Sequence, residues 1–338
     1  MGKKVLWQVI NISFGCNKNC DFCFVKGLSK IPQEVMGSKE IDSIVDTYKQ
    51  HTIQYGVSNH NVFDIVGGEP LLYVDQAKEL FVKIAEITPD IIFAISTNGL
   101  LLDESFILWT KKHKVSIALS ANDTSTKVLK DIMRLISSLR RNGKLHIALT
   151  KFNLARVEEL VDFCSEVGFN PRLRSEYKIG TDQEHLKMFD EIVPKLVQKI
   201  IDKDYDFYPQ YFYEITNPFW KGEMNHICGR HIVTIDPNLN VRLCPGQDHK
   251  IGNLKDVDFD YFKAMDKSDH PRFGYKGIIQ CEQCELRNIC GSGCPLSKKL
   301  AFGRVDVPSP LCQIHKKVFP LVFKMGDRWI QKGGTTRF

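Results

Sequence analysis

Along the N-terminal two thirds of the chain, short apolar runs alternate with longer stretches in which apolar residues recur every three or four positions. The first pattern predicts buried strands and the second predicts amphipathic helices. We predict strands at 7–13, 62–66, 91–96, 115–120, 145–150 and 171–174, and helices near 39–52, 74–87, 103–112, 124–142, 154–167 and 184–202. Ser38 is the predicted N-cap of the first helix.

Nearly continuous apolar strands separated by amphipathic helices indicate a parallel sheet that is buried on both faces. Six such units in succession predict an α/β fold, an open parallel (β/α)6 partial barrel over residues 1–204. In parallel barrels the carboxyl ends of the strands carry the chemistry. Polar residues that directly follow the predicted strands are therefore the candidate site residues.

The first predicted strand leads into a loop with cysteines at 16, 20 and 23. Spacings of three and two residues let one short loop wrap three thiolates around a metal cluster, and thiolates favour zinc, copper(I) or iron-sulfur centres. A structural zinc site would need a fourth protein ligand nearby. Three cysteines alone leave one iron of a four-iron cluster open to an outside ligand. Unrelated or disulfide-bonded cysteines are the alternative.

The second predicted strand runs into Gly67-Gly68-Glu69-Pro70. Two glycines after a buried strand let a ligand approach the backbone closely, and a glutamate carboxylate can receive an ammonium group. A simple strand-to-helix turn is the alternative. The sequence has no glycine-rich phosphate loop, which disfavours an enzyme of nucleoside triphosphates or dinucleotides.

From about Tyr205 the alternation gives way to aromatic residues, prolines and glycines, which predicts a second domain over 205–338. This region holds a second set of cysteines, namely Cys228, Cys244, Cys281, Cys284, Cys290, Cys294 and Cys312. A zinc ribbon is one reading, but seven cysteines exceed the need of one zinc ion. The remaining cysteine, Cys164, lies on the apolar side of a predicted helix and is expected in the core.

Composition describes an ordinary globular protein, with 338 residues, 43% of them hydrophobic and 25% charged. A net charge of +6 without an arginine-rich tract argues against a nucleic-acid partner. We interpret two short basic runs as solvated surface, namely Lys298-Lys299 and His315-Lys316-Lys317. Neither a membrane-length apolar run nor a signal peptide is present in the sequence, so we expect a cytoplasmic protein without a membrane partner. Its cysteines then favour metal over disulfides.

The cysteine loop, with Phe22 just before its third cysteine, resembles the radical S-adenosylmethionine (radical SAM) superfamily. The resemblance implies that Cys16, Cys20 and Cys23 hold a 4Fe-4S cluster, whose open iron binds SAM through its amino and carboxylate groups. It also implies cleavage of SAM by one electron to methionine and a 5'-deoxyadenosyl radical, which takes a hydrogen atom from the substrate. A one-electron donor such as flavodoxin or ferredoxin is the implied partner.

The same resemblance implies a set of SAM contacts. In this family the stretch matching Gly67-Gly68-Glu69-Pro70 contacts the methionyl amine. The expected SAM-binding residues are Phe22, Gly67, Gly68, Glu69, Pro70, Thr97, Asn98, Ser120, Asn153 and Arg174. For Lys151, Arg174 and Glu176 a substrate contact or a salt bridge is an equally open role. No catalytic acid or base is assigned from the sequence.

The spacing Cys281-x2-Cys284-x5-Cys290-x3-Cys294, with a later Cys312, resembles the C-terminal extension called SPASM. This extension occurs on radical SAM enzymes that mature peptides, sulfatases and some small molecules. The resemblance implies two auxiliary 4Fe-4S clusters and so three clusters in all. The outer one would be held by Cys281, Cys284, Cys290 and Cys312, and the inner one by Cys228, Cys244 and Cys294. The auxiliary clusters would accept the electron left after C–H oxidation, or hold substrate.

The chain departs from the family pattern at three positions. Leu239 stands where a glycine is usual. Gly222 stands where sulfatase-maturing relatives have a further cysteine, so the inner cluster has three cysteine ligands, and either His226 or His231 completes it or one iron is open. Pro245 replaces the acidic base of those relatives, which puts oxidation of a serine or cysteine in doubt.

The leading functional hypothesis is modification of a ribosomally synthesised peptide by crosslinking, epimerisation or oxidation. Only fifteen residues precede Cys16, so an N-terminal peptide-recognition domain is expected to be absent, and recognition would be direct or through a separate leader-binding protein. The alternative is an enzyme that acts on a sugar, aminoglycoside or nucleoside. A third class, an iron-sulfur scaffold or electron carrier without SAM chemistry, is disfavoured by the stretch 67–70.

Overall fold

The computed structural model describes residues 6–28, 34–56, 61–121, 124–139, 143–203, 205, 232–268 and 275–331. The chain folds as two compact units, Met1–Leu119 with Ile227–His270, and Ser120–His226 with Pro271–Phe338. This division follows the packing of the chain. The domain boundary expected near residue 204 stays a prediction.

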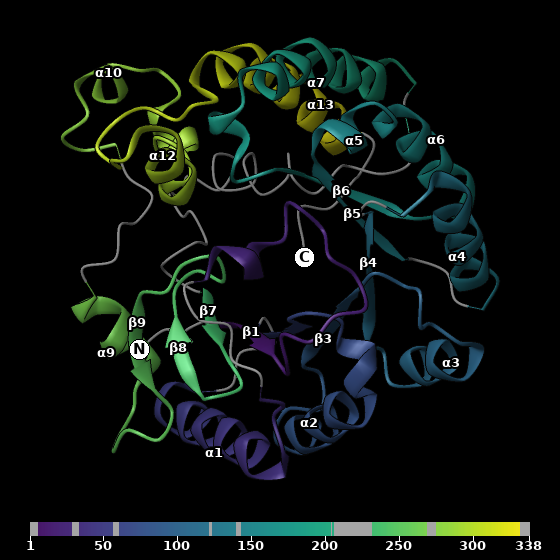
Figure 1. The fold of residues 1–338 in the computed structure, drawn as a ribbon, viewed down its shortest axis with the longest axis vertical. Coiled ribbons are helices and arrows are strands. Elements are labelled where there is room, and N and C mark those ends of the chain that lie inside the picture. Colours follow the sequence, from purple (N-terminus) through teal and green to yellow (C-terminus); the bar gives the residue numbers. More distant parts are fainter. Residues whose placement is uncertain are drawn as a thin grey trace. The chain divides into compact units, whose positions relative to one another are not determined.

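The first unit is built on a mainly parallel sheet. It contains β1 (Trp7–Asn11), η1 (Phe24–Gly27), α1 (Ser38–Tyr55), β2 (Val62–Val66), η2 (Pro70–Tyr73), α2 (Val74–Ile87), β3 (Ile92–Thr97), α3 (Glu104–Lys112), most of β4 (Ser116–Ala121), β7 (Ile232–Ile235), β8 (Asn240–Arg242), β9 (Lys250–Asn253) and α9 (Tyr261–Lys267). Its strands lie in the order β4-β3-β2-β1-β7-β8-β9 (Figure 1). The first four and β7 run parallel, whereas β8 and β9 are antiparallel to their neighbours.

The second unit contains one parallel strand pair and most of the remaining helices. Its elements are α4 (Thr126–Leu139), β5 (Lys144–Leu149), α5 (Lys151–Leu154), α6 (Val157–Val167), β6 (Asn170–Ser175), η3 (Ile179–Thr181), α7 (Gln183–Lys203), α10 (Ile279–Glu282), α11 (Arg287–Cys290), α12 (Pro295–Phe302) and α13 (Cys312–Gln331). The register of β5 and β6 pairs Leu149 with Ser175, so both strands end at the same edge.

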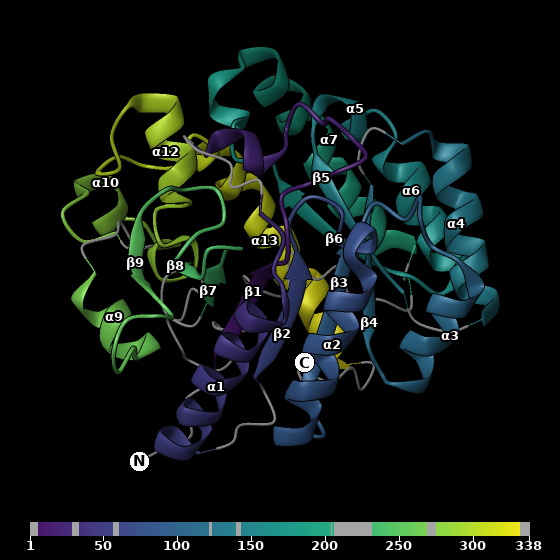
Figure 2. The same ribbon diagram turned by 60° about the horizontal axis from the view of Figure 1, so that its bottom comes forward.

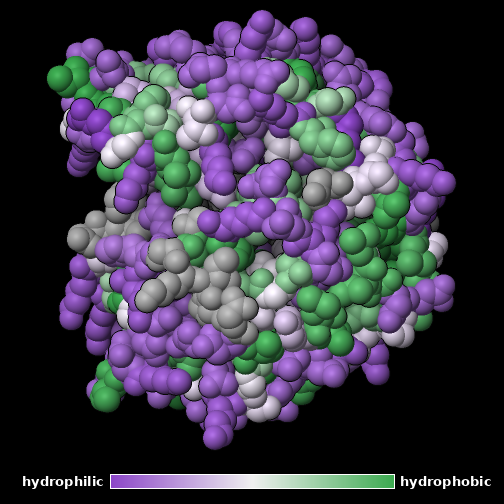
Figure 3. Space-filling view, in the orientation of Figure 1, coloured by the Kyte–Doolittle hydropathy of each residue, from purple (hydrophilic) through white to green (hydrophobic). Residues whose placement is uncertain are grey.

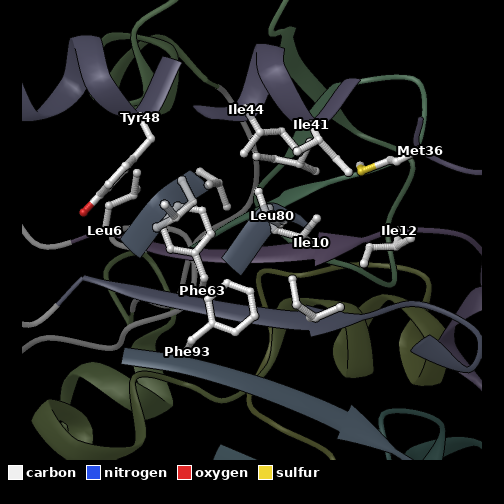
Figure 4. Packing of buried hydrophobic residues seen from close by; sticks show 14 of the residues in the cluster. Leu6, Ile10, Ile12, Met36, Ile41, Ile44, Tyr48, Phe63, Leu80 and Phe93 are labelled. Carbon is white, nitrogen blue, oxygen red and sulfur yellow. The ribbon is translucent and has the colours of Figure 1, made fainter. Parts of the chain in front are cut away.

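The core of the first unit lies between its strands and the helices α1 and α2, which run along one face of β1 to β3 (Figure 2). Ile44 and Tyr48 of α1 point from the helix toward Phe63 of β2 (Figure 4). The rings of Tyr48 and Phe63 meet edge to face with centroids 5.0 Å apart. Burying each such side chain contributes about 1.5–3 kcal/mol, so the helices hold the strand ends in fixed positions.

Two of the differences between predicted and observed helix boundaries have a clear local cause. The first helix already begins at Ser38 and its N-cap is Gly37, because Glu40 accepts a hydrogen bond from the Gly37 N–H at 3.1 Å. The helix predicted at 154–167 is α6, which begins only at Val157, and the short helix α5 precedes it. They are separated at Arg156, whose backbone leaves the helical region and whose side chain bonds to Asn153.

The strands after residue 231 were not predicted from the sequence. β7 lies beside β1 in parallel, and the Asn11 side chain donates a 3.2 Å hydrogen bond to the Ile235 carbonyl. The turn after β7 is closed by Asp236, which is completely buried and forms a 2.6 Å ion pair with Arg242. Leu239 in this turn has a φ of +63°. Glycine adopts a left-handed backbone without steric cost, and here a fully buried leucine adopts it.

None of the helices in the described part of the chain is both long enough and apolar enough to cross a bilayer. Most of the surface seen in Figure 3 is hydrophilic, and hydrophobic side chains gather mainly on the right of that view. Lys298, expected at the surface, is only 2% exposed. That expectation was wrong, because α12 turns this lysine into the interior of the cysteine-rich region.

Candidate active site

The first cysteine of the loop, Cys16, lies five residues after the end of β1, and a small apolar cluster packs beneath the loop. Phe14, Val25 and Leu28 pack together, with Cys23 and Phe24 against them. The N–H of Cys23 donates to the Cys20 carbonyl at 3.2 Å, which closes the turn between the second and third cysteines. No disulfide joins the described cysteines. Phe22, half-buried, lies on the same turn.

The glycines after β2 are required by the cysteine loop itself. Gly68 and Glu69 donate backbone hydrogen bonds of 2.9 and 2.8 Å to the carbonyls of Ser13 and Gly15. A Cβ on Gly67 would lie 2.2 Å from the Ser13 oxygen, and one on Gly68 would lie 1.9 Å from the Gly15 oxygen. Real Cβ atoms do not come this close to a backbone oxygen. Protein backbone therefore makes the close approach that the sequence led us to expect from a ligand.

Glu69 is the hub of a buried network that joins three loops. Its carboxylate accepts hydrogen bonds from the Leu71 N–H at 3.0 Å, the Thr97 hydroxyl at 2.6 Å and the Asn98 N–H at 2.8 Å. Asn98 in turn donates from its side chain to the side chain of Asn17, in the cysteine loop, at 2.7 Å. A carboxylate offers about four lone-pair sites. One site is left for an ammonium donor from a ligand.

The environment of Cys16 favours a neutral thiol unless a metal is bound. Burial raises the pKa of the Cys16 thiol, and Glu69 and Cys23 add to that shift, whereas the N–H of Lys18, 3.4 Å from the sulfur, opposes it. A thiolate here needs a nearby cation, and a bound metal supplies that charge. Three soft sulfur donors on one loop fit an iron-sulfur cluster. Cys16, Cys20 and Cys23 are the residues that would hold it.

In the second unit, the side chain of Asn153 is committed to protein partners. Its amide donates to the carbonyls of Ala121 and Ala148 at 2.5 and 2.7 Å, and its oxygen accepts from Arg156 at 2.8 Å. All donors and acceptors of the amide are thus used. Ser120 is half-buried near the end of β4. Their SAM contacts remain predictions, and Asn153 has the clearer structural role.

Three other candidate residues follow or lie in β5 and β6, and two of them have charged partners within the protein. Lys151 forms ion pairs with Asp182, at 2.9 Å, and with Glu184. An exposed salt bridge is therefore its role in this structure. Arg174 is exposed on β6. Glu176 lies 3.7 Å from Nδ1 of His185, whose Nε2 lies 2.7 Å from the Leu149 carbonyl. Burial raises the pKa of Glu176, and the nearby His185 opposes the shift.

The four cysteines expected to hold the outer auxiliary cluster gather within the second unit. The thiols of Cys281, Cys284, Cys290 and Cys312 interact electrostatically, and burial raises the pKa of Cys290 to about 12. Two four-residue helices and the start of α13 carry three of them, since Cys281 lies in α10, Cys290 ends α11 and Cys312 begins α13. Burial and the neighbouring thiols raise the pKa of Cys281 and Cys290, and four thiols gathered in this way fit a site that a metal cluster completes.

The inner auxiliary cluster stays a prediction. Cys228, His226, His231 and Gly222 lie outside the described residues. Cys244 belongs to the first unit and Cys294 to the second. Within the described ranges, no group of three or more His, Cys, Asp or Glu side chains is placed so that it could hold a single metal ion. Cys164 is fully buried in α6, as predicted.

Sequence reasoning missed two residues at these sites. Asn17, between the first two cysteines, carries the bond to Asn98, but nothing in the sequence separates it from its polar neighbours. His315 lies with Nδ1 3.4 Å from the Cys290 sulfur and stacks on Phe319. Its place three residues after Cys312 on an amphipathic helix was the available signal. The solvated surface expected for His315 is wrong, because the ring is packed in this region.

Comparison with known families and proteins gives a consistent result. The family model described as the Radical SAM superfamily matches residues 10–175. The chain is 23% identical to a probable GTP 3',8-cyclase of Sulfurisphaera tokodaii, over 80% of this chain and 90% of that protein. It is 20% identical to a cysteine-type anaerobic sulfatase-maturating enzyme of Clostridium perfringens, over 92% of this chain and 94% of that protein.

Two solved structures have the same fold. The anaerobic sulfatase-maturating enzyme anSMEcpe with bound AdoMet matches with a TM-score of 0.77 at 18% identity, over 96% of this chain and 99% of that one. SuiB of Streptococcus suis bound to its precursor peptide SuiA matches with a TM-score of 0.63 at 19% identity, over 87% and 72%. The predicted fold, a partial barrel followed by a cysteine-rich region, is confirmed. Residues 10–175 are a radical SAM domain, and the protein is an enzyme.

Proposed function

We propose that this enzyme modifies a ribosomally synthesised peptide, starting with abstraction of a hydrogen atom from a carbon of that peptide. The observation that carries the radical step is the Glu69 network, which ties the cysteine loop to the ends of β2 and β3. A bound 4Fe-4S cluster and SAM would supply the 5'-deoxyadenosyl radical. The chain's own residues would fix the loop, receive the SAM amine and exclude water.

Support for a peptide substrate comes from the relatives. The structural likeness extends through the cysteine-rich region to a sulfatase-maturating enzyme and to SuiB, a protein that binds a precursor peptide. Three 4Fe-4S clusters and the SAM contacts named from the sequence belong to the same proposal. The electron acceptor after C–H oxidation would be an auxiliary cluster, and the electron donor a flavodoxin or ferredoxin.

Pro245 narrows the reaction. It follows Cys244 where sulfatase-maturing relatives have an acidic residue, and a proline side chain cannot accept a proton. We therefore place crosslinking or epimerisation ahead of oxidation of a serine or cysteine to an aldehyde.

Anaerobic reconstitution and SAM cleavage test the radical step. The protein should contain about twelve irons, four for each of three clusters, and should release 5'-deoxyadenosine on reduction with dithionite and SAM. Replacing Cys16, Cys20 and Cys23 by alanine should abolish this release and leave about eight irons bound. Release that persists in the triple variant would show that the radical is generated elsewhere.

Deuterium transfer tests the substrate. Short peptides encoded beside the gene, synthesised with deuterated side chains and incubated with the enzyme, should transfer deuterium to 5'-deoxyadenosine and change mass. A scrambled peptide of the same composition is the control. Transfer from no neighbouring peptide, together with active SAM cleavage, would contradict the peptide proposal and leave the radical step intact.

A second candidate is a nucleoside or nucleotide substrate. It is favoured by the likeness to the probable GTP 3',8-cyclase, which covers 90% of that protein. The same transfer assay with deuterated nucleosides and nucleotides separates the two candidates, because only the true substrate delivers deuterium to the product.

A further inference from the structure

Lys298 is a buried cation in the cysteine-rich region. It is 2% exposed, the most buried lysine among the described residues and one of the largest fully buried side chains. Lysine is almost never fully buried unless it is paired. Its helix, α12, is anchored by its neighbour Ser297, whose hydroxyl donates a 2.8 Å hydrogen bond to the Tyr177 carbonyl. The position of Lys298 is thus built into the packing.

The hydrogen-bond partner of Lys298 is neutral. Its ammonium donates to the Ser292 hydroxyl oxygen at 2.8 Å. Ser292 is itself 2% exposed and lies on the short turn between Cys290 and Cys294. Among the described residues, no carboxylate lies within ion-pair distance of Lys298, and the nearby Asp306 is paired with Arg304. A conventional salt bridge does not account for the buried charge.

Apart from the Asp306 carboxylate, the groups that act on this ammonium are sulfurs. Burial lowers the pKa of Lys298, and Cys281, Cys290 and Cys294 oppose that shift. Moving an ion out of water costs several kcal/mol after relaxation unless opposite charge compensates it. Neutral thiols compensate little. Thiolates that ligate a 4Fe-4S cluster carry the negative charge that is missing, and one-electron reduction of that cluster adds one more negative charge.

We propose that Lys298 is the fixed counter-charge of the outer auxiliary cluster, the one assigned to Cys281, Cys284, Cys290 and Cys312, and that it raises the reduction potential of this cluster. The proposal rests on the cluster assignment in the proposed function. A positive charge held in a dry site favours the more negative, reduced state of the cluster. Lys298 thereby makes the cluster a better acceptor for the electron that leaves the substrate radical.

An EPR-monitored redox titration of the reconstituted protein, with dithionite as reductant, tests this role. Lys298→Met removes the charge and keeps a long apolar side chain. We expect the reduced-to-oxidised ratio of the outer cluster to fall about tenfold at a given potential, equivalent to about 59 mV for one electron. Lys299→Met, the same change at the next and exposed position of α12, is the matched control and should shift nothing.

Two further variants separate charge from packing. Ser292→Ala removes the hydrogen-bond acceptor and keeps the charge, so the potential should stay close to that of the wild type. Lys298→Arg keeps the charge, and it should retain iron and potential if Lys298→Met proves to lose the cluster. An unchanged potential in Lys298→Met, or loss of iron in Lys298→Arg as well as in Lys298→Met, would overturn the proposal.

The wild-type iron content distinguishes failure of this role from failure of the proposed function. About twelve irons and auxiliary signals in the wild type, with no shift in Lys298→Met, refute the role of Lys298 alone. About four irons, with intact SAM cleavage, refute the auxiliary cluster itself and the role of Lys298 with it.

Discussion

The hydroxyl of Thr97 donates a 2.6 Å hydrogen bond to Oε1 of Glu69, and both residues are at most 2% exposed. This bond joins the last residue of β3 to the turn after β2. The same carboxylate accepts the Asn98 N–H, and Asn98 holds the cysteine loop through Asn17. The residue expected to receive the SAM amine is therefore also the residue that fixes the loop for the cluster.

Replacing Thr97 by valine should loosen this network. The change keeps the shape of the side chain and removes one of the two donors to Oε1 of the buried carboxylate, which costs about 1–3 kcal/mol. We expect lower stability in urea and weaker SAM binding by anaerobic calorimetry. Thr97→Ser keeps the hydroxyl and should stay near the wild type. If the serine and valine variants lose SAM affinity equally, the hydrogen bond is not what matters.

Replacing Gly68 by alanine should displace the cysteine loop. The new methyl group would lie 1.9 Å from the backbone oxygen of Gly15, so the loop or the turn must move. We expect a loss of about four of twelve irons, with auxiliary iron retained. Gly168→Ala is the matched control, because Gly168 has a φ of +72° but open space around its Cβ position. It should cost about 1 kcal/mol of stability and no iron.

Leu239 gives an unusual order of stabilities. Its left-handed backbone costs about 1–2 kcal/mol for a residue with a Cβ, whereas loss of its buried side chain costs about 2–5 kcal/mol. Leu239→Gly should therefore destabilise the protein, and Leu239→Ala should destabilise it more. Urea unfolding at fixed pH checks the order. An alanine variant more stable than the glycine variant would mean that the backbone is not left-handed there.

Glu176 should make stability depend on pH. Burial raises its pKa in the folded protein, with His185 opposing the shift and Asp182 adding to it. The folded state then holds this proton more tightly than the unfolded state, so the stabilisation is complete below the ordinary pKa and is lost as pH rises through the raised pKa.

Glu176→Gln should accordingly be more stable than the wild type at about pH 8 and nearly equal to it at about pH 4. Urea unfolding at several pH values measures the difference. Glu166→Gln, which changes an exposed glutamate of α6, is the control. A difference that grows toward acid pH would contradict the assigned direction.

The sequence predicted the parts of the fold that depend on local pattern. No tertiary information was needed to find the strands β1 to β5, because burial on both faces produces a continuous apolar run. The spacing of Cys16, Cys20 and Cys23 is likewise visible in a short stretch of sequence. The extended segment at 171–174 proved to be β6, which pairs with β5 over six residues.

What the sequence could not predict depends on contacts between distant residues. Lys298 looked like surface because a lysine pair usually is, and only the packing of α12 shows that it is buried. We assigned Gly67 and Gly68 to ligand contact from the sequence. The Cβ positions show instead that a backbone oxygen 53 residues earlier leaves no room for a side chain at Gly68. The pairing of β7 with β1 spans more than 200 residues and leaves no local trace.

The backbone bonds from Gly68 and Glu69 to the cysteine loop have a consequence for how this enzyme can vary. They involve main-chain atoms only, so exchanging the side chains of Lys18, Asn19 or Asp21 leaves them untouched. A methyl group at Gly68, by contrast, would collide with the backbone oxygen of Gly15 and disrupt these hydrogen bonds. The side chains of the loop are therefore free to vary, while the spacing between the two turns stays constant.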